Sequence, residues 1–205
     1  GVPAERIFSG PYCVDNARFE SLARHYEPQR HELRARWRIP EQACVFLYCG
    51  KFVEKKRPLD LLRSFALAAP EFARPAVHLL MVGEGPLRRE CERFANERGL
   101  SVSFTGFLNQ GQIPKAYVAA DCLVLPSDYG ETWGLVVNEA MACGRPALVS
   151  DRVGCHPDLI VPGVTGEVFA FGGVAALGGL LQRLAAAPGR LAAMGARTRT
   201  HVAAY

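Results

Sequence analysis

The sequence predicts an α/β fold in which a doubly wound parallel sheet is covered by helices on both faces. From residue 43 onwards, short apolar runs rich in β-branched residues alternate with longer segments whose apolar residues repeat at helical spacing. Strands that are buried on both faces are apolar throughout, and a helix between two such strands is the connection that parallel neighbours need. With 205 residues, the chain is long enough to bury a core as one domain without a disulfide or a metal.

Strands and helices alternate in order from residue 44. The expected strands span residues 44–49, 77–82, 102–105, 122–125 and 147–149, with a sixth at 167–169. The expected helices lie near residues 59–69, 87–98, 113–120, 133–143, 174–186 and 188–205. The first of these helices carries its apolar residues on one stripe, at Leu59, Leu62, Phe65, Ala66 and Ala69.

The two ends of the chain differ from its middle. Residues 1–40 contain four prolines, and their only candidate strand is the short run at residues 6–9. In the basic segment 30–38, Leu33 and Trp37 are four residues apart, which predicts a solvated helix that docks by one edge. The chain stops at Tyr205 without a helix-ending signal, which indicates a fragment of a longer protein.

The composition excludes several classes of protein. The net charge of +4 is mild and basic residues are not massed with aromatic ones, so nucleic acid is not an expected partner. Charge or glycine interrupts every apolar stretch well before the roughly 20 residues of a membrane span, and the first residues lack a signal pattern. The seven cysteines include no Cys-x-x-Cys pair, so we expect buried free thiols in a cytoplasmic protein.

Motifs for metal binding and for hydrolysis are absent from the sequence. The five histidines form no pair at helical spacing and no Asp-x-Asp occurs, so we expect no metal site. The Gly-x-Ser-x-Gly elbow and the phosphate-binding Gly-x4-Gly-Lys-Ser/Thr loop are absent as well, which argues against a hydrolase and a nucleotide-hydrolysing enzyme.

Ligands of open parallel sheets bind at the carboxyl ends of the strands, so the turns after the strands are the first candidates for function. Residues 50–58 carry four basic residues and one acidic residue directly after the first strand. This loop either holds a phosphate or is simply solvated, and the residues leave both readings open. Gly83 and Gly85 form a later Gly-x-Gly turn, but Arg88 replaces the third glycine of the dinucleotide fingerprint, which favours a plain tight turn.

The turn at residues 126–134 brings two carboxylates to the start of a helix. Glu131 lies in the loop and Glu139 lies about two turns into the expected helix. Helix N–H groups accept phosphate oxygens, and carboxylates accept hydrogen bonds from sugar hydroxyls. Glu131 could merely complement the dipole of its own helix. Glu139, however, stands among apolar residues and needs a partner, which favours a binding site.

Short motifs in these turns occur in a fixed order over residues 50–166. The most specific is Glu131-x7-Glu139 followed by Ala140-Met141-Ala142-Cys143-Gly144-Arg145-Pro146. The others are Gly50-Lys51 with Lys56, Met81-Val82-Gly83-Glu84-Gly85-Pro86, Phe104-Thr105-Gly106-Phe107, the run from Ala120-Asp121 to Pro126-Ser127, and Gly163-Val164-Thr165-Gly166. Together they resemble the Rossmann-like, nucleotide-sugar-binding C-terminal half of the retaining GT-B glycosyltransferases of family 4, the glycosyl transferases group 1.

The resemblance implies a role for each of these residues. Glu131 binds hydroxyls of the donor sugar, and Glu139 binds the ribose diol of the nucleotide. Lys51 and Lys56 neutralise the departing diphosphate, although Lys51 stands where many relatives have the bidentate Arg. The expected catalytic residues are therefore Lys51, Lys56 and Glu131. The other expected substrate-binding residues contact the phosphates, the sugar or the base: Gly50, Gly83, Gly85, Gly106, Phe107, Thr132, Trp133 and Gly134.

The resemblance also implies a longer enzyme. Residues 1–40 would be a linker and docking segment from a missing N-terminal acceptor domain, and residues 41–205 the nucleotide-sugar donor-binding domain. We expect a bacterial hexosyltransferase that needs no cofactor and no metal, and a fragment that is inactive or weakly active alone. Its expected partners are the nucleotide sugar and the missing domain. For the full-length enzyme, a membrane-associated acceptor and a peripheral location at the inner membrane stay open.

Two other functions stay open at this stage. Gly83-x-Gly85 could be the cofactor turn of a dinucleotide-dependent oxidoreductase, but the third glycine is missing and no acidic residue ends the next strand. A degenerate nucleotide-binding module without catalysis is the other alternative, and the presence of Lys56, Glu131 and Glu139 argues against it.

Overall fold

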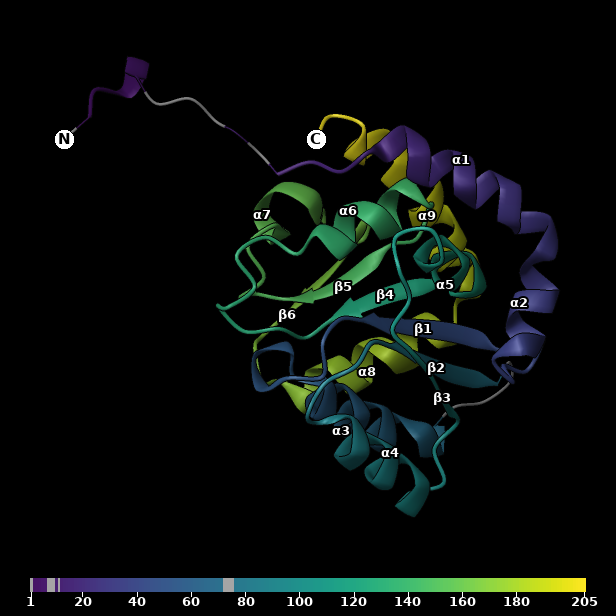
Figure 1. Cartoon of the computed structure of the whole chain (residues 1–205). Helices are drawn as coiled ribbons and strands as arrows, with labels where there is room; N and C mark the ends of the chain where they lie inside the picture. The colour runs from purple at the N-terminus through teal and green to yellow at the C-terminus, as the bar shows by residue number, and fades with distance from the viewer. Residues whose placement is uncertain (1, 7–9, 11, 72–75) are drawn as a thin grey trace.

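A computed structural model describes residues 2–6, 10, 12–71 and 76–205 as a three-layer α/β domain (Figure 1). Its six-stranded sheet has the order β3-β2-β1-β4-β5-β6, and every neighbouring pair is parallel. The strands are β1 (Cys44–Cys49), β2 (Val77–Val82), β3 (Val102–Gly106), β4 (Cys122–Leu125), β5 (Ala147–Ser150) and β6 (Gly166–Phe169). The predicted doubly wound parallel sheet is confirmed.

Helices cover both faces of this sheet. In the view of Figure 1, α3 (Pro58–Ala68), α4 (Arg88–Glu97) and α8 (Val174–Ala185) lie below it. The upper layer holds α1 (Asn16–Tyr26), α2 (Arg30–Arg36), α5 (Ile113–Ala119), α6 (Leu135–Ala142) and α7 (His156–Leu159). The last helix is α9 (Pro188–Val202), and the short 3-10 turns are η1 (Ala4–Arg6), η2 (Glu27–Gln29), η3 (Glu54–Lys56) and η4 (Ala69–Glu71).

The two layers enclose two hydrophobic clusters, one on each face of the sheet. Alternate residues of β1 point to opposite faces, so Val45 and Leu47 join the cluster under α5 and α6, while Phe46 and Tyr48 join the cluster over α3 and α8. The same strand therefore belongs to both cores. This double burial explains why β1 is apolar throughout.

The N-terminal segment contributes more to the domain than its sequence indicates. Helix α1, which the sequence analysis does not predict, buries Phe19 and Ala23 in the core, and the Asp15 side chain caps its first turn. Helix α2 ends at Arg36, and the expectation of a solvated basic face is wrong for Arg34, which is buried. Of the candidate strand at residues 6–9, only Arg6 lies within the described residues, and it closes η1.

A buried charge network explains the burial of Arg34. At the amino end of β4, Asp121 accepts from Arg34 Nη2 at 3.0 Å and from Arg30 Nη2 at 2.5 Å. Arg34 also donates to the backbone carbonyls of Ala43 and Ala119. Arg30, Arg34, Ala43 and Asp121 line a cavity of about 890 Å³ between α9 and the segment from α1 to α2. The network joins α2 to the amino edge of the sheet, so part of the basic segment 30–38 is structural.

The cysteines agree with the expectation of buried free thiols. All seven cysteines are free thiols, and all but Cys13 are buried. None of the helices formed by the described residues is long and apolar enough to cross a membrane.

A histidine joins the edge strand β3 to the core. His78 on β2 is buried, and its two ring nitrogens lie 2.8 Å from Ser101 Oγ and 3.0 Å from Ser103 Oγ. Burial and the nearby charge of Arg34 lower the pKa of His78 to about 4. The folded protein therefore holds a neutral imidazole at this position near pH 7.

We predict that His78 makes the free energy of unfolding depend on pH below 6.5. Because its pKa is about 4 in the folded state and 6.5 ordinarily, the unfolded chain takes up a proton between these values and the folded chain does not. The stability is complete above pH 6.5 and is lost as the pH falls, with a limiting slope of about 1.4 kcal/mol per pH unit. Urea denaturation of wild type and His78→Gln across this range measures the effect. Equal slopes for the two proteins would contradict it.

Candidate functional site

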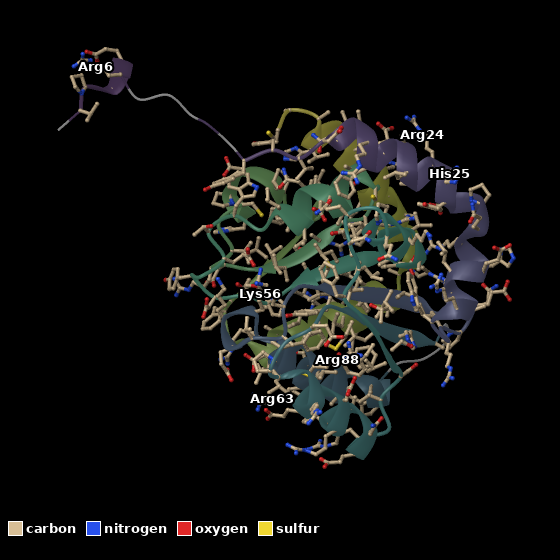
Figure 2. The ribbon with its side chains drawn as sticks, in the orientation of Figure 1. Arg6, Arg24, His25, Lys56, Arg63 and Arg88 are labelled. Carbon is tan, nitrogen blue, oxygen red and sulfur yellow. The ribbon has the colours of Figure 1, made fainter. Side chains whose placement is uncertain are left out.

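The candidate site lies where the chain leaves β1 and β4 at the carboxyl edge of the sheet. In the observed strand order, β1 and β4 are neighbours whose connections run to opposite faces, to α3 from β1 and to α6 from β4. Open α/β sheets bind ligands at such a switch point. The labelled Lys56 marks this edge in Figure 2, on the side of the molecule away from α1 and α2.

Lys56 and Glu131 join the two loops at this switch point. The Lys56 ammonium forms an ion pair with Glu131 Oε2, and the side chains are 17% and 13% exposed. Ser127 Oγ donates to the same carboxylate oxygen at 3.3 Å. Beside them, Lys55 Nζ donates to the Gly130 carbonyl at 3.2 Å, and the Asp128 N–H donates to the Lys55 carbonyl at 2.8 Å. The structure thus brings together a predicted cation and a predicted carboxylate that are 75 residues apart.

The surroundings of Lys56 make its charge sensitive to pH. Burial lowers the pKa of Lys56 to about 8, and the neighbouring charges of Lys55 and Lys51 act in the same direction. The attached Glu131 carboxylate favours the charged form and opposes them. Lys51 itself is exposed at the rim of the same loop, and its carbonyl accepts a hydrogen bond from Tyr48 at 2.8 Å. Lys51 and Lys56 thus place two cations at one strand end.

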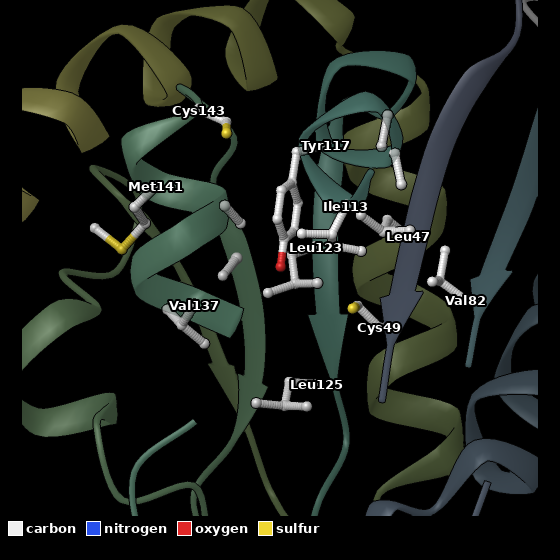
Figure 3. Close-up of a cluster of buried hydrophobic side chains, with 14 of the residues drawn as sticks. Leu47, Cys49, Val82, Ile113, Tyr117, Leu123, Leu125, Val137, Met141 and Cys143 are labelled. Carbon is white, nitrogen blue, oxygen red and sulfur yellow. The ribbon is translucent and has the colours of Figure 1, made fainter. Parts of the chain in front are cut away.

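Glu139 occupies a separate, buried position on α6. It is 6% exposed and accepts hydrogen bonds from the Tyr117 hydroxyl at 2.6 Å and from the Gln110 amide at 3.4 Å. Burial raises the pKa of Glu139, while these two hydrogen bonds and the charge of Arg18 oppose the shift. Figure 3 shows the Tyr117 ring descending from α5 with its hydroxyl directed towards the carboxyl ends of β1 and β4. The partner that the sequence required for Glu139 is therefore supplied by the protein.

Sequence reasoning missed Tyr117 and Gln110. The only signal for Tyr117 is a hydroxyl-bearing residue in a helix that is otherwise apolar around it, and Gln110 lies in an exposed polar loop with no signal. Neither residue has a role in the sequence analysis, because Glu139 lies 22 residues from Tyr117 and 29 residues from Gln110 in the sequence.

The start of α6 differs in detail from the expectation. The helix begins at Leu135 with Gly134 as its N-cap at φ 101°, so Glu139 lies little more than one turn into it rather than two. The indole of Trp133 donates to the Asn138 side chain at 2.9 Å, and the Trp133 carbonyl accepts from the Cys155 N–H at 2.9 Å. Thr132 is exposed, with its carbonyl packed against Gly154. The Val137 N–H donates to the carbonyl of the N-cap Gly134 at 2.8 Å, so the N–H groups of Leu135 and Val136, which precede the first bond of the helix, are the ones suited to an anion.

Gly83 and Gly85 are required by the packing of the chain on itself. A Cβ on Gly83 would lie 1.9 Å from the Gly50 carbonyl oxygen, and one on Gly85 would lie 2.5 Å from the Phe52 carbonyl oxygen. The Phe52 N–H donates to the Glu84 carbonyl at 2.9 Å, so the two loops form a small backbone ladder. This close approach accounts for the glycines without a ligand and removes the main support for a dinucleotide turn.

Gly106 and Phe107 lie at the end of β3, on the same edge. Gly106 has φ 82°, and the position of a Cβ there is 3.1 Å from Glu84 Oε1 and 3.5 Å from Arg88 Nη1. Phe107 is 74% exposed. Together with Gly50 after β1, they belong to the rim of the site, whereas Glu139 forms a buried part of it.

Within residues 2–6, 10, 12–71 and 76–205, no three His, Cys, Asp or Glu side chains come together in a way that could hold a metal ion.

The comparisons with known proteins define the family. The family described as glycosyl transferases group 1 matches residues 29–201, and the chain belongs to this family. It is 38% identical over 130 residues to a GDP-mannose-dependent alpha-(1-6)-phosphatidylinositol dimannoside mannosyltransferase of Mycobacterium tuberculosis, covering 61% of this chain and 32% of that protein. It is 35% identical over 159 residues to the sulfoquinovosyl transferase SQD2 of Arabidopsis thaliana, covering 76% and 29%.

Solved structures show the same relationship. Sucrose-phosphate synthase from Thermosynechococcus elongatus superposes with a TM-score of 0.72 at 32% identity, over 84% of this chain and 44% of that one. WaaG, a glycosyltransferase involved in lipopolysaccharide biosynthesis, superposes with a TM-score of 0.74 at 26% identity, over 87% and 48%. The chain spans less than half the length of these relatives.

We predict that Gly83→Ala destabilises the fold far more than Gly99→Ala. Both glycines have positive φ, at 133° and 58°, so both substitutions introduce backbone strain of about 1–3 kcal/mol. Only the Cβ at position 83 meets a backbone oxygen, since nothing lies within 4 Å of the one at position 99. Urea denaturation of both variants gives the difference, which should exceed about 1 kcal/mol. Equal losses of the free energy of unfolding in the two variants would show that the loop after β1 shifts freely away from residue 83.

Proposed function

We propose that this chain is the donor-binding domain of a retaining glycosyltransferase that transfers a sugar from a nucleoside-diphosphate sugar without a metal ion. The observation that carries the proposal is the Lys56–Glu131 ion pair across the β1/β4 switch point, next to the start of α6. Membership of glycosyl transferases group 1 supports it. The similarity to a GDP-mannose-dependent mannosyltransferase supports a sugar nucleotide as the donor.

The cations of the site suit a diphosphate leaving group. As the bond between sugar and diphosphate breaks, negative charge grows on the diphosphate oxygens, and fixed positive charge lowers the energy of that state. Lys51 and Lys56 supply this charge after β1, and the N–H groups at the start of α6 supply donors after β4. No divalent ion is needed for this stabilisation in the proposed reaction.

The two glutamates suit different parts of the donor. Glu131 is already anchored to Lys56, so its carboxylate stands beside the diphosphate and accepts from hydroxyls of the transferred sugar. Glu139 is held by Tyr117 at one oxygen, which leaves the second oxygen, near Gln110, to accept from the ribose diol. The base rests against Gly106 and Phe107.

The acceptor binds to the proposed full-length enzyme. We assign its binding site to an N-terminal domain outside this chain that closes over the carboxyl edge of the sheet. The enzyme acts in the cytoplasm in this proposal, and a membrane-associated acceptor would require it to be peripheral at the inner membrane. A phosphatidylinositol dimannoside, which the name of one mannosyltransferase relative mentions, is an example of such an acceptor.

We predict that substitutions of Glu131 and Glu139 have different effects on ligand affinity, which calorimetry measures. Loss of a carboxylate that accepts hydrogen bonds from bound hydroxyls costs about 1.5–3 kcal/mol. Glu139→Ala should therefore weaken a nucleoside diphosphate and its sugar nucleotide alike. Glu131→Gln should weaken only the sugar nucleotide, and it should not weaken the diphosphate, because it removes a negative charge from Lys56. The panel contains uridine, guanosine and adenosine diphosphates with their sugars.

The controls of this experiment test the rest of the proposal. Dinucleotides serve as the comparison ligands, and binding of a dinucleotide alone would replace the proposed function by a dinucleotide-dependent one. A chelator added to each titration should leave the dissociation constant unchanged. Equal losses for both ligands in Glu131→Gln would remove Glu131 from the sugar site.

We also predict that diphosphate affinity falls above pH 8. Lys56 has a pKa of about 8 in the unliganded protein, and a bound diphosphate raises it by attraction. Binding above pH 8 therefore requires uptake of a proton, and the association constant should fall towards a limit of about tenfold per pH unit. The terminal phosphate, with a pKa of about 6, is already ionised in this range. Lys56→Met should bind more weakly with a flat profile, and a flat profile in the wild type would refute the assignment.

A further inference from the structure

Helix α1 reaches the buried Glu139 through a chain of polar contacts. Arg18 Nη2 donates to the backbone carbonyl of Gln110 at 3.1 Å, and the side-chain amide of the same Gln110 donates to Glu139 Oε1 at 3.4 Å. Arg18 lies 92 residues from Gln110 in the sequence. The two contacts link the N-terminal segment to the carboxylate that the proposed function assigns to the ribose.

Helix α1 is a firm support for Arg18. Its residues Phe19 and Ala23 are buried against α5 and α6, and Asn16 Nδ2 donates to the Val202 carbonyl at 3.0 Å. Arg18 Cζ also lies 5.8 Å from the centre of the Phe19 ring. The guanidinium therefore projects from a fixed helix over the loop after β3.

Gln110 lies in the exposed part of that loop. Residues 109–112 are exposed, and Asn109 Oδ1 accepts from the N–H groups of Gly111 and Gln112 within the loop itself. The two ends of the loop are held by the domain, since Leu108 packs against the core and the N–H of the buried Ile113 donates to the Asn109 carbonyl at 2.9 Å. Between these ends, the bond from Arg18 joins the Gln110 backbone to α1 and restrains the distance between the Gln110 amide and Glu139.

We propose that Arg18 is a positioning residue for nucleotide binding, which holds Gln110 beside Glu139 so that the two side chains grip the ribose from two sides. The Glu139 carboxylate accepts from the ribose hydroxyls, and the Gln110 amide both donates and accepts. The positive charge of Arg18 also favours the ionised form of the buried carboxylate. The inference rests on the proposed function, and it makes α1 a part of the donor site.

The test compares two arginines of the same helix. Arg18→Met removes the donor and keeps the length of the side chain. Arg24→Met is the matched control, because Arg24 lies on the same helix (Figure 2), its side chain is exposed, and among the described residues its ion pair is with Glu20 of α1, at 3.3 Å. Calorimetry measures the dissociation constants of uridine and guanosine diphosphates, their 2′-deoxy analogues and inorganic pyrophosphate, and thermal unfolding confirms that each variant is folded.

A positioning role gives a loss that depends on the ribose. Arg18→Met should weaken the ribonucleoside diphosphate about three- to tenfold, the worth of one hydrogen bond, and should leave pyrophosphate within about twofold. The preference for the ribonucleotide over its 2′-deoxy analogue should shrink by the same factor. Gln110→Ala should reproduce this pattern, Arg18→Lys should restore part of the affinity, and Arg24→Met should resemble the wild type.

The measurements distinguish failure of this inference from failure of the proposed function. Wild-type affinity for the ribonucleotide in Arg18→Met overturns the inference and leaves the proposed function intact. An equal loss for pyrophosphate also overturns it, because Arg18 would then act by general attraction of anions. If the wild type binds none of the uridine, guanosine and adenosine diphosphates, the proposed function fails and this inference fails with it.

Discussion

The parallel pairing of β1 with both β2 and β4 is the constraint on which the rest of this structure depends. Six residue pairs join β1 to β2 along its whole length, and Phe46 and Leu47 join it to β4 on the other side. Parallel neighbours need crossover helices, and the crossovers that leave β1 and β4 go to opposite faces. Because the crossovers diverge, the loops that carry Lys56 and Glu131 meet between the ends of the two strands.

The carboxylates at the two ends of the sheet have different partners. At the amino end, Asp121 is paired with two arginines that also donate to backbone carbonyls, which gives a structural network. At the carboxyl end, Glu131 has a single lysine, and Glu139 has two neutral hydrogen-bond donors. A buried carboxylate with neutral partners keeps a raised pKa and acceptor capacity. This contrast supports the proposal that the ligand binds at the carboxyl end.

Glycine illustrates how one residue type serves the fold and the site in different ways. Gly83 and Gly85 are needed because the loop after β1 passes within contact distance of their Cα atoms. Gly134 permits the left-handed N-cap from which α6 begins, at the switch point itself. A glycine motif in the sequence indicates only that the backbone at these positions lies close to a neighbouring group, either a ligand or another segment of the chain. The tertiary structure shows that for Gly83 and Gly85 the neighbour is the chain itself.

The sequence by itself determined the sheet. Strands β1, β2 and β4 have the predicted bounds, because strands buried on both faces are uninterrupted apolar runs whose ends are marked by glycine or charge. It also determined that Lys56, Glu131 and Glu139 lie in turns or helix starts at one edge, since all parallel strands end there. These are consequences of local pattern and of a topology that short connections enforce.

Only the tertiary structure decided what each charge contacts. Helix α1 escaped the sequence analysis because it buries only Phe19 and Ala23, too few to produce a clear apolar stripe. The side-chain partners of Glu139 and Arg34 lie 22 to 87 residues away, at distances along the chain where local periodicity carries no information. Side chains so far apart meet only when packing fixes the layers. For that reason the sequence predicted the position of the candidate site, whereas the structure revealed Tyr117, Gln110 and Arg18 around Glu139.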